Sequence, residues 1–298
     1  MVNDQGSSFK WFLLITFSIS WISFGTGILF GYLDQNTGRD VFYLIGAIGP
    51  SIAPLSLMFT YQNKEYNKNF WIRIYYPRKG PMWLVLSTVF LPIIMNMLFI
   101  FLSLIDSGPT FTFGNFMSKN GIFLIFSLIG ILGWFGYAFP LFHKNIEELQ
   151  KLKLLRFLHV VKKLKNKMEA LERKILENFK KLSWIYTGLA IGGLWSIWNI
   201  PIAFILGSYP QSLGVSNFGF WEFFLLIPIQ CLIISWVYVK TDNSTFVVLI
   251  FFLADITRLF FTIPLIFQII RFIFWILVAV FLILNELVLH LIPIPESK

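Results

Sequence analysis

Residues 133–142 read GWFGYAFPLF and end a long apolar run. Within this stretch Gly133 and Gly136 each precede a large aromatic residue, and Pro140 follows shortly before a basic segment that begins at His143. Glycines let neighbouring helices approach closely, and a proline marks a helix end or a kink. The stretch therefore predicts the end of a membrane helix that packs tightly against its neighbours, although Gly, Trp and Pro are also common in membrane helices generally.

The composition of the whole chain supports this interpretation. Of the 298 residues, 57% are hydrophobic and only 13% are charged, which is far more apolar than a soluble domain of this length. Strand-like alternation is absent, so the sequence predicts an all-α integral membrane protein. Cys231 is the single cysteine, which excludes an intrachain disulfide and leaves the redox compartment open.

The apolar runs predict about eight membrane-spanning helices in a single membrane domain, residues 1–298. Their ranges are 9–33, 41–61, 81–105, 121–142, 184–206, 220–239, 246–265 and 270–291. Lys and Arg gather after the second and fourth spans, whereas residues 207–220 contain neither. Because basic loops stay on the cytoplasmic side, both termini are expected in the cytoplasm. The net charge of +9 is then a topology signal, and no motif accompanies it that would indicate nucleic-acid binding.

The segment 143–182 is the one long stretch expected outside the membrane. It holds twelve Lys or Arg against five Glu, and its apolar residues recur at three-four spacing. We expect a long basic cytoplasmic helix or helical hairpin, and three partners fit it: another chain in a coiled coil, anionic lipid headgroups, or the bundle's own cytoplasmic face. His143 and Glu147 are one helical turn apart, but no third metal ligand is near in sequence, so solvated surface residues are the simpler interpretation.

Few polar residues fall inside the predicted spans, where an ionised side chain costs about 2.5–3.5 kcal/mol or more at the bilayer centre. Asp255 and Arg258 share one helical face, so they either neutralise each other or line a wet cavity. Glu286 and His290 lie near enough to the interface to extend their polar ends to it. Asn96, Asn199, Gln230 and Arg271 are further polar residues within the predicted spans.

Three stretches in chain order carry a motif pattern. The first contains Gly133, Trp134, Gly136, Tyr137 and Pro140, the second, WSIWNIP, contains Trp195, Trp198 and Pro201, and the third contains Trp236, Thr241 and Ser244. This order resembles the CAAX protease and bacteriocin-processing family (CPBP, also called Abi), whose members are intramembrane metalloprotease-like helical bundles. The resemblance implies a CPBP-type bundle over most of the chain.

The reactive residues that the resemblance implies are not present. The family carries a Glu-Glu pair and an Arg in the first motif, a His in the second, and a His and an Asn in the third. The corresponding residues here are Gly130, Ile131, Phe135, Asn199, Phe252 and Ile256. A shift of one residue in the third motif gives Phe251 with Asp255 or Leu253 with Thr257, and neither restores a histidine. Metal-assisted hydrolysis needs ligands for the ion and a base for the attacking water, so we expect no catalytic residue, metal or cofactor.

The sequence therefore predicts a pseudoprotease that binds a membrane-embedded peptide, lipid or protein partner without cleaving it. The residues expected to form its binding cavity are Trp134, Trp195, Trp198, Asn199, Asp255 and Arg258. One alternative is an active intramembrane protease, similar to CAAX prenyl endopeptidases, that uses a non-standard site. A transporter or channel is a second alternative, against which the lack of internal repeats counts.

Overall fold

The computed structural model describes the greater part of the chain. The described residues are 2–61, 64–75, 90–95, 97–98, 101, 125–126, 128–146, 148, 169–260 and 265–291. Within them the side chains of residues 2–7, 61, 64–66, 169–181, 255–260 and 288–291 are not described. In these ranges every regular element is a helix and there is no strand, which confirms the all-α prediction.

The helices have the following bounds. They are α1 (Val2–Tyr32), α2 (Asn36–Tyr61), α3 (Lys64–Tyr75), η1 (Leu132–Ala138), α8 (Glu169–Asn199), η2 (Ile200–Phe204), α9 (Tyr209–Leu213), α10 (Phe218–Thr241), α11 (Ser244–Phe260) and α12 (Leu265–Leu291). Here η1 is a π-helix and η2 a 3₁₀-helix.

Five of the described helices are long and apolar enough to cross a membrane. Their spans are Ser8–Tyr32, Asn36–Thr60, Leu182–Phe204, Phe218–Thr241 and Leu265–Leu287. Each overlaps one predicted span, and the apolar helix Ser244–Ala254 begins the predicted span 246–265. Most of the predicted span 81–105, including Asn96, lies outside the described residues. The protein is thus a multi-pass integral membrane protein.

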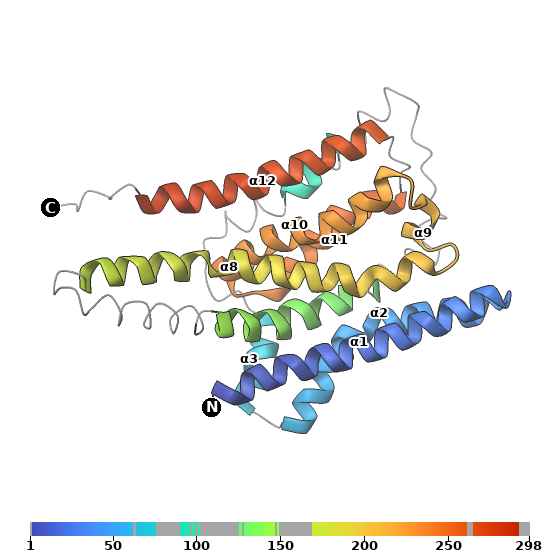
Figure 1. Ribbon diagram of the computed structural model, residues 1–298, viewed down its shortest axis with the longest axis horizontal. Coiled ribbons are helices and arrows are strands. Elements are labelled where there is room, and N and C mark those ends of the chain that lie inside the picture. The colour runs from blue at the N-terminus through green and yellow to red at the C-terminus, as the bar shows by residue number, and fades with distance from the viewer. Residues whose placement is uncertain are drawn as a thin grey trace.

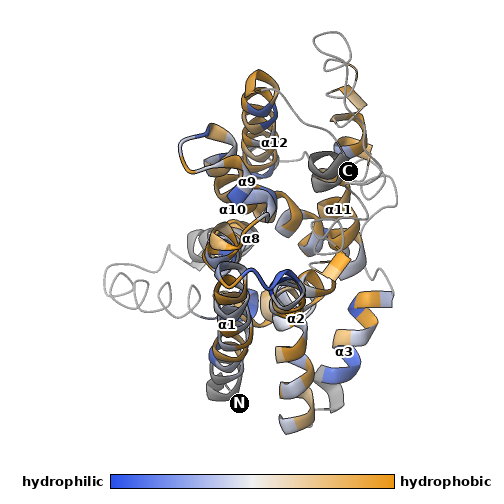
Figure 2. Cartoon of the chain, turned by 90° about the vertical axis from the view of Figure 1, so that its right-hand side faces the viewer, coloured by the Kyte–Doolittle hydropathy of each residue, from blue (hydrophilic) through white to orange (hydrophobic). Residues whose placement is uncertain are grey.

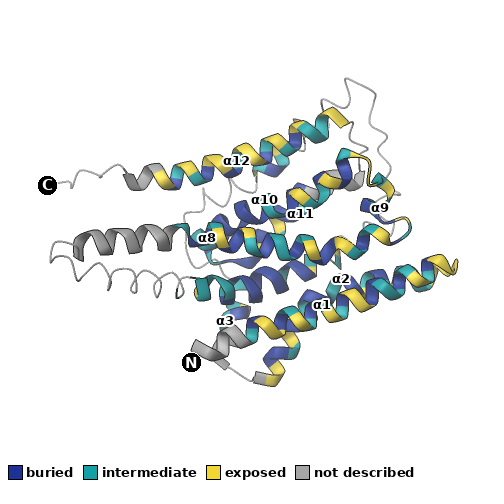
Figure 3. Cartoon of the chain, in the orientation of Figure 1, coloured by how far each residue is buried: buried dark blue, intermediate teal, exposed yellow. Residues whose placement is uncertain are grey.

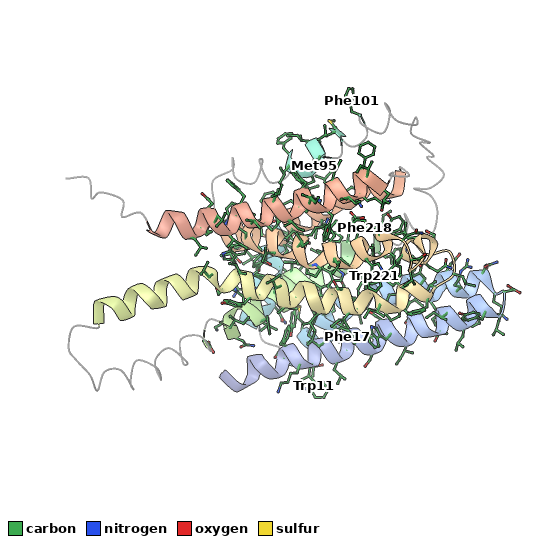
Figure 4. All side chains as sticks on the ribbon, turned by 45° about the horizontal axis from the view of Figure 1, so that its top comes forward. Trp11, Phe17, Met95, Phe101, Phe218 and Trp221 are labelled. Atoms are coloured by element: carbon green, nitrogen blue, oxygen red, sulfur yellow. The ribbon has the colours of Figure 1, made fainter. Side chains whose placement is uncertain are left out.

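The long helices lie roughly parallel to one another in a layered bundle. α12 is at one side and α1 at the other, with α10 and α8 between them (Figures 1 and 2). α10 is the most buried of the long helices, whereas α12 exposes much of its surface (Figure 3). Many outward side chains are large and apolar, which suits contact with lipid: Trp11 and Phe101 point away from the bundle in Figure 4 and are 46% and 61% exposed.

Small residues let α8 and α10 pack closely. A Cβ added to Gly188 would lie 3.0 Å from Cα of Leu232, and one added to Gly192 would lie 2.6 Å from Cα of Pro228. These two glycines are four residues apart and therefore on the same face of α8. The contact follows the small-residue pattern that membrane helices use for close association.

Two polar contacts hold α12 to α10. Arg271 donates two hydrogen bonds to the Glu222 carboxylate, from Nε to Oε1 at 2.8 Å and from Nη2 to Oε2 at 2.7 Å, and both side chains are 2% exposed. Further along both helices, Trp236 Nε1 donates to Glu286 Oε1 at 2.8 Å, and Lys240 Nζ lies 2.6 Å from the same oxygen. Because residue numbers rise together in the two contacts, α10 and α12 run in the same direction.

The position of Glu286 corrects one expectation. The sequence favoured a side chain that extends to the membrane interface, but the Glu286 side chain is only 5% exposed. The reason is that Trp236 and Lys240 of α10 supply a hydrogen bond and an opposite charge inside the bundle. The side chain of His290 lies outside the described residues.

Candidate functional site

The stretch that opened the sequence analysis contains a π-helix. η1 covers LGWFGYA at 132–138, and after it the backbone N–H of Phe139 donates to the carbonyl of Trp134, five residues earlier. Helical residues continue beyond Pro140 to residue 146, so the proline does not end the helix. Because Pro140 has no N–H to donate to Gly136, the turn before it is free to widen. Single π turns of this kind are frequent at functional sites.

Glycines bring this segment against the backbone of α2. A Cβ on Gly133 would lie 1.8 Å from the carbonyl oxygen of Pro50, and a Cβ on Gly130 would lie 2.9 Å from that of Ala47. Gly130 is one of the two positions at which the CPBP motif has a glutamate. A longer side chain there would require α2 to move, because the atom it meets belongs to the main chain.

Aromatic side chains from the three motif stretches meet at Trp195 of α8. Its ring centroid lies 6.4 Å from that of Trp134, with the rings 17° from parallel, and 6.4 Å from that of Phe135. The Trp195 ring also stacks on that of Phe251 of α11, with the ring centroids 4.7 Å apart and the rings 23° from parallel. We call Trp134, Phe135, Trp195 and Phe251 the aromatic cluster. All four side chains are buried.

Three of the predicted site residues carry buried polar atoms: Trp134 of the aromatic cluster, Trp198 and Asn199. Asn199 is buried, and its Nδ2 donates to the carbonyl of Trp195 at 2.9 Å. The indole N–H groups of Trp134 and Trp198 are buried, and neither finds an acceptor within the described part of the chain. Trp198 is in ring contact with Phe24 of α1, at 5.6 Å. Buried donors are nearly always paired in proteins, so an acceptor would be favourable at these two indoles, as it would at other buried polar atoms of the described chain such as Trp184 Nε1.

The other predicted positions differ in how deeply they are buried and in whether their side chains are described. Ile131 and Phe135 are fully buried, while Phe252 is only partly buried. In the third motif it is Phe251, not Phe252, that faces Trp195. The side chains of Asp255, Ile256, Thr257 and Arg258 lie outside the described residues, although all four are in α11.

His143 contacts α8 at the end of the motif helix. Its ring stacks on Phe139 at 5.4 Å and 15°, and its Nδ1 lies 3.0 Å from Thr187 Oγ1. Thr187 Oγ1 itself donates to the carbonyl of Ser183 at 2.9 Å, and the other ring nitrogen, His143 Nε2, lies 3.4 Å from Ser183 Oγ. His143 therefore joins two helices, which the expectation of a solvated surface residue did not include. Glu147, its possible co-ligand, is outside the described residues.

The side chains that the structure describes at the site do not offer a set of ligands for a divalent metal ion. Gly130, Ile131, Phe135 and Phe251 offer no ligand atom, and Asn199 offers only an amide oxygen. Across the side chains that the structure describes, no group of three His, Cys, Asp or Glu lies close enough to hold a metal. We therefore derive no reaction step through a metal.

Sequence reasoning missed the carboxylate partners of two residues that it had named. It noted Arg271 but not Glu222, and it took Trp236 from the third motif without its acceptor Glu286. These partners are 49 and 50 residues apart in the chain, beyond the reach of any helical spacing rule. The only available signal was that Glu222 lies just inside the predicted span 220–239, where an unpaired charge is costly.

Comparison with known proteins agrees with the motif pattern. No family model matches the chain. The chain is 24% identical over 276 residues to a protein named CAAX prenyl protease 2 from Methanococcus maripaludis, a match that covers 87% of this chain and 86% of that protein. The similarity supports the CPBP, CAAX protease-like family that the three motifs indicate.

Proposed function

We propose that this CAAX protease-like membrane protein is a pseudoprotease that binds a membrane-embedded peptide, lipid or partner helix at the aromatic cluster and does not cleave it. The observation that supports this proposal is that side chains from the three motif stretches meet at Trp195 through aromatic rings. The resemblance implies an arginine at the position of Phe135 and a histidine at the position of Asn199, one helical turn after Trp195. The scaffold is retained and the reactive groups are replaced. Such a site can hold an apolar segment, and none of the described side chains of the aromatic cluster can act as a base for a water molecule.

The chemistry of the ligand follows from the two unpaired indoles. Trp134 and Trp198 each offer a buried N–H, which suits a carbonyl or ester oxygen carried by an otherwise apolar molecule. Trp195 and Asn199 would complete the wall of the binding cavity. Asp255 and Arg258 of α11 are assigned to the same cavity, where Arg258 would suit a carboxylate or phosphate.

The proposed bundle has eight spans, with the predicted spans 81–105, 121–142 and 246–265 added to the five long apolar helices. The start of α1 and the end of α12 lie at the same end of the bundle, where α3 also lies (Figure 1). The basic segment 143–182 begins at this end, and its residues 169–182 continue without a break into α8. Since basic segments stay in the cytoplasm, we assign both termini to the cytoplasm and the segment to anionic headgroups or a cytoplasmic partner.

Two measurements on protein purified in lipid nanodiscs test this function. Elemental analysis is expected to find no stoichiometric zinc or cobalt, and a prenylated C-terminal peptide is expected to remain uncut. A photo-crosslinking amino acid at Trp198 is expected to capture a bilayer-embedded peptide or lipid, whereas the same amino acid at Trp21, which is 42% exposed on α1, gives the background of bulk lipid contact. Equal capture at the two positions would refute the binding site.

An active protease is the second candidate, because the similar archaeal protein is named as a prenyl protease. On this alternative the prenylated peptide is cleaved, and cleavage stops when Asn199 or Asp255 is replaced by alanine. Stoichiometric metal together with such cleavage would replace the pseudoprotease proposal. Unchanged cleavage in both variants would remove these two residues from the mechanism.

A further inference from the structure

The short helix α3 differs from the membrane-spanning helices in length and in composition. Its sequence, KEYNKNFWIRIY, has twelve residues and contains both charged or polar side chains and aromatic or aliphatic ones. It lies at the outer edge of the bundle beside α2, at the end where α1 begins (Figures 1 and 2). This end is the one to which the basic segment 143–182 also belongs.

Both ends of α3 lie near the ends of membrane spans. Its first residue, Lys64, follows the α2 span by only three residues, so the chain reaches at most about 14 Å from Thr60. Near its last residue, Arg73 Nε lies 3.4 Å from Oδ1 of Asp242, which directly follows the last residue of the α10 span. Thr245 Oγ1, at the start of α11, donates to the carbonyl of Ile74. α3 therefore lies across the end of the bundle, parallel to the membrane surface.

The inner side of α3 packs against the motif helices. Phe70 is buried, and its Cε2 would lie 2.9 Å from a Cβ added to Gly136 of η1. Asn67 Nδ2 donates to the carbonyl of Met58 in α2, at 3.4 Å. These contacts fix how α3 is rotated, and so decide which of its residues face away from the protein.

The outer side consists of Lys68, Trp71 and Tyr75, which are three and four residues apart and share one face. Lys68 is exposed, Trp71 is 44% exposed and Tyr75 is 66% exposed. The Trp71 and Tyr75 rings stack at 6.3 Å with an angle of 18°. Tryptophan and tyrosine are the residues that gather at headgroup level, where a lysine also reaches phosphate groups.

We infer that α3 is a membrane-surface helix whose face of Lys68, Trp71 and Tyr75, which we call the α3 outer face, binds the headgroups of anionic phospholipids. The headgroup layer is about 5–8 Å deep on each side of the hydrocarbon core, which matches a helix tied to the ends of two spans. The cation contacts the lipid phosphate and the stacked rings lie at the glycerol level. This inference does not depend on the proposed function of the aromatic cluster.

Depth-dependent fluorescence quenching tests the location of the helix. In a Cys231→Ser background, which removes the single cysteine, an environment-sensitive dye is attached at Tyr75→Cys and, as a matched control, at Leu277→Cys in the middle of the α12 span. The protein is reconstituted in vesicles of phosphatidylcholine and phosphatidylglycerol in equal parts. We expect a nitroxide at the headgroup to quench the dye at 75 most strongly, and a nitroxide in the middle of the acyl chain to quench the dye at 277.

The charge of the lipid is tested with the same labelled protein. A headgroup nitroxide on phosphatidylglycerol is expected to quench the dye at 75 more than the same nitroxide on phosphatidylcholine, and Lys68→Gln is expected to reduce this preference about fivefold. Equal quenching by the two lipids would refute the binding of anionic headgroups. A dye at 75 that neither nitroxide quenches would show that water, a second copy or another protein meets this face, and would overturn the inference.

Discussion

Gly133→Ala tests whether the close approach of η1 to α2 holds the candidate site together. The added Cβ would lie 1.8 Å from the Pro50 oxygen, short of ordinary contact at 3.4 Å by about 1.6 Å. Both atoms belong to main-chain positions that cannot rotate away, so the helices must separate, and such overpacking costs about 1–3 kcal/mol. Alanine regains about 1 kcal/mol of helix propensity. From the upper end of that range we expect a net loss of about 2 kcal/mol, or about 4–8 °C in apparent Tm.

The assay is thermal unfolding of the detergent-purified protein, followed by the fluorescence of its 11 tryptophans. Gly193→Ala in α8 is the matched control, because a Cβ at Gly193 would meet nothing within 4 Å. The two substitutions are chemically identical, so their difference isolates the packing. We expect Gly193→Ala to leave Tm unchanged or raise it slightly. If Gly133→Ala is as stable as Gly193→Ala, the contact with Pro50 does not constrain the helix and the packing argument fails.

Three further predictions concern buried groups. Glu222→Gln leaves the buried Arg271 guanidinium without its carboxylate and should destabilise the protein by about 3–5 kcal/mol in a denaturation assay. Adding Arg271→Met to this variant should recover most of the lost stability. No recovery would argue against the ion pair. Trp195→Ala removes the ring at which the motif stretches meet and should lower the free energy of unfolding by about 3–5 kcal/mol. Trp221→Ala, at an exposed position, should lower it far less. Equal losses of stability in the two variants would contradict the packing of the aromatic cluster. Cys231 is fully buried, so a maleimide should label it only after unfolding, and rapid labelling of the folded protein would show that its surroundings open.

The sequence predicted the helical class and the approximate positions of the long helices. The predicted span 220–239, for example, corresponds to Phe218–Thr241 in the structure. Such spans can be predicted because the length and hydropathy of one segment decide whether it can cross the membrane, and no other segment needs to be known. The resemblance to a family was also accessible, since it depends on the order of three short motifs along the chain, and the similarity to a CAAX prenyl protease supports it.

The details of the candidate site were less accessible. The sequence left the third motif in three possible registers, and only the contact with Trp195 distinguishes Phe251 from Phe252. For Pro140 it left a helix end or a kink open, and the structure excludes the end, because helical residues continue to residue 146. Which of the two phenylalanines faces Trp195 depends on how α11 is rotated against α8, and a rotation of one residue changes the side that a side chain faces.

The sequence by itself determined that this chain enters the membrane many times as helices, because burial of apolar side chains in lipid is summed residue by residue along each segment. Only the tertiary structure decided which polar groups meet inside that bundle. Arg271 is tolerated there because Glu222 comes from a different helix and satisfies it with two hydrogen bonds. A pair of this kind depends on the distance and orientation of two helices, and these are fixed by packing between segments that are far apart in the chain.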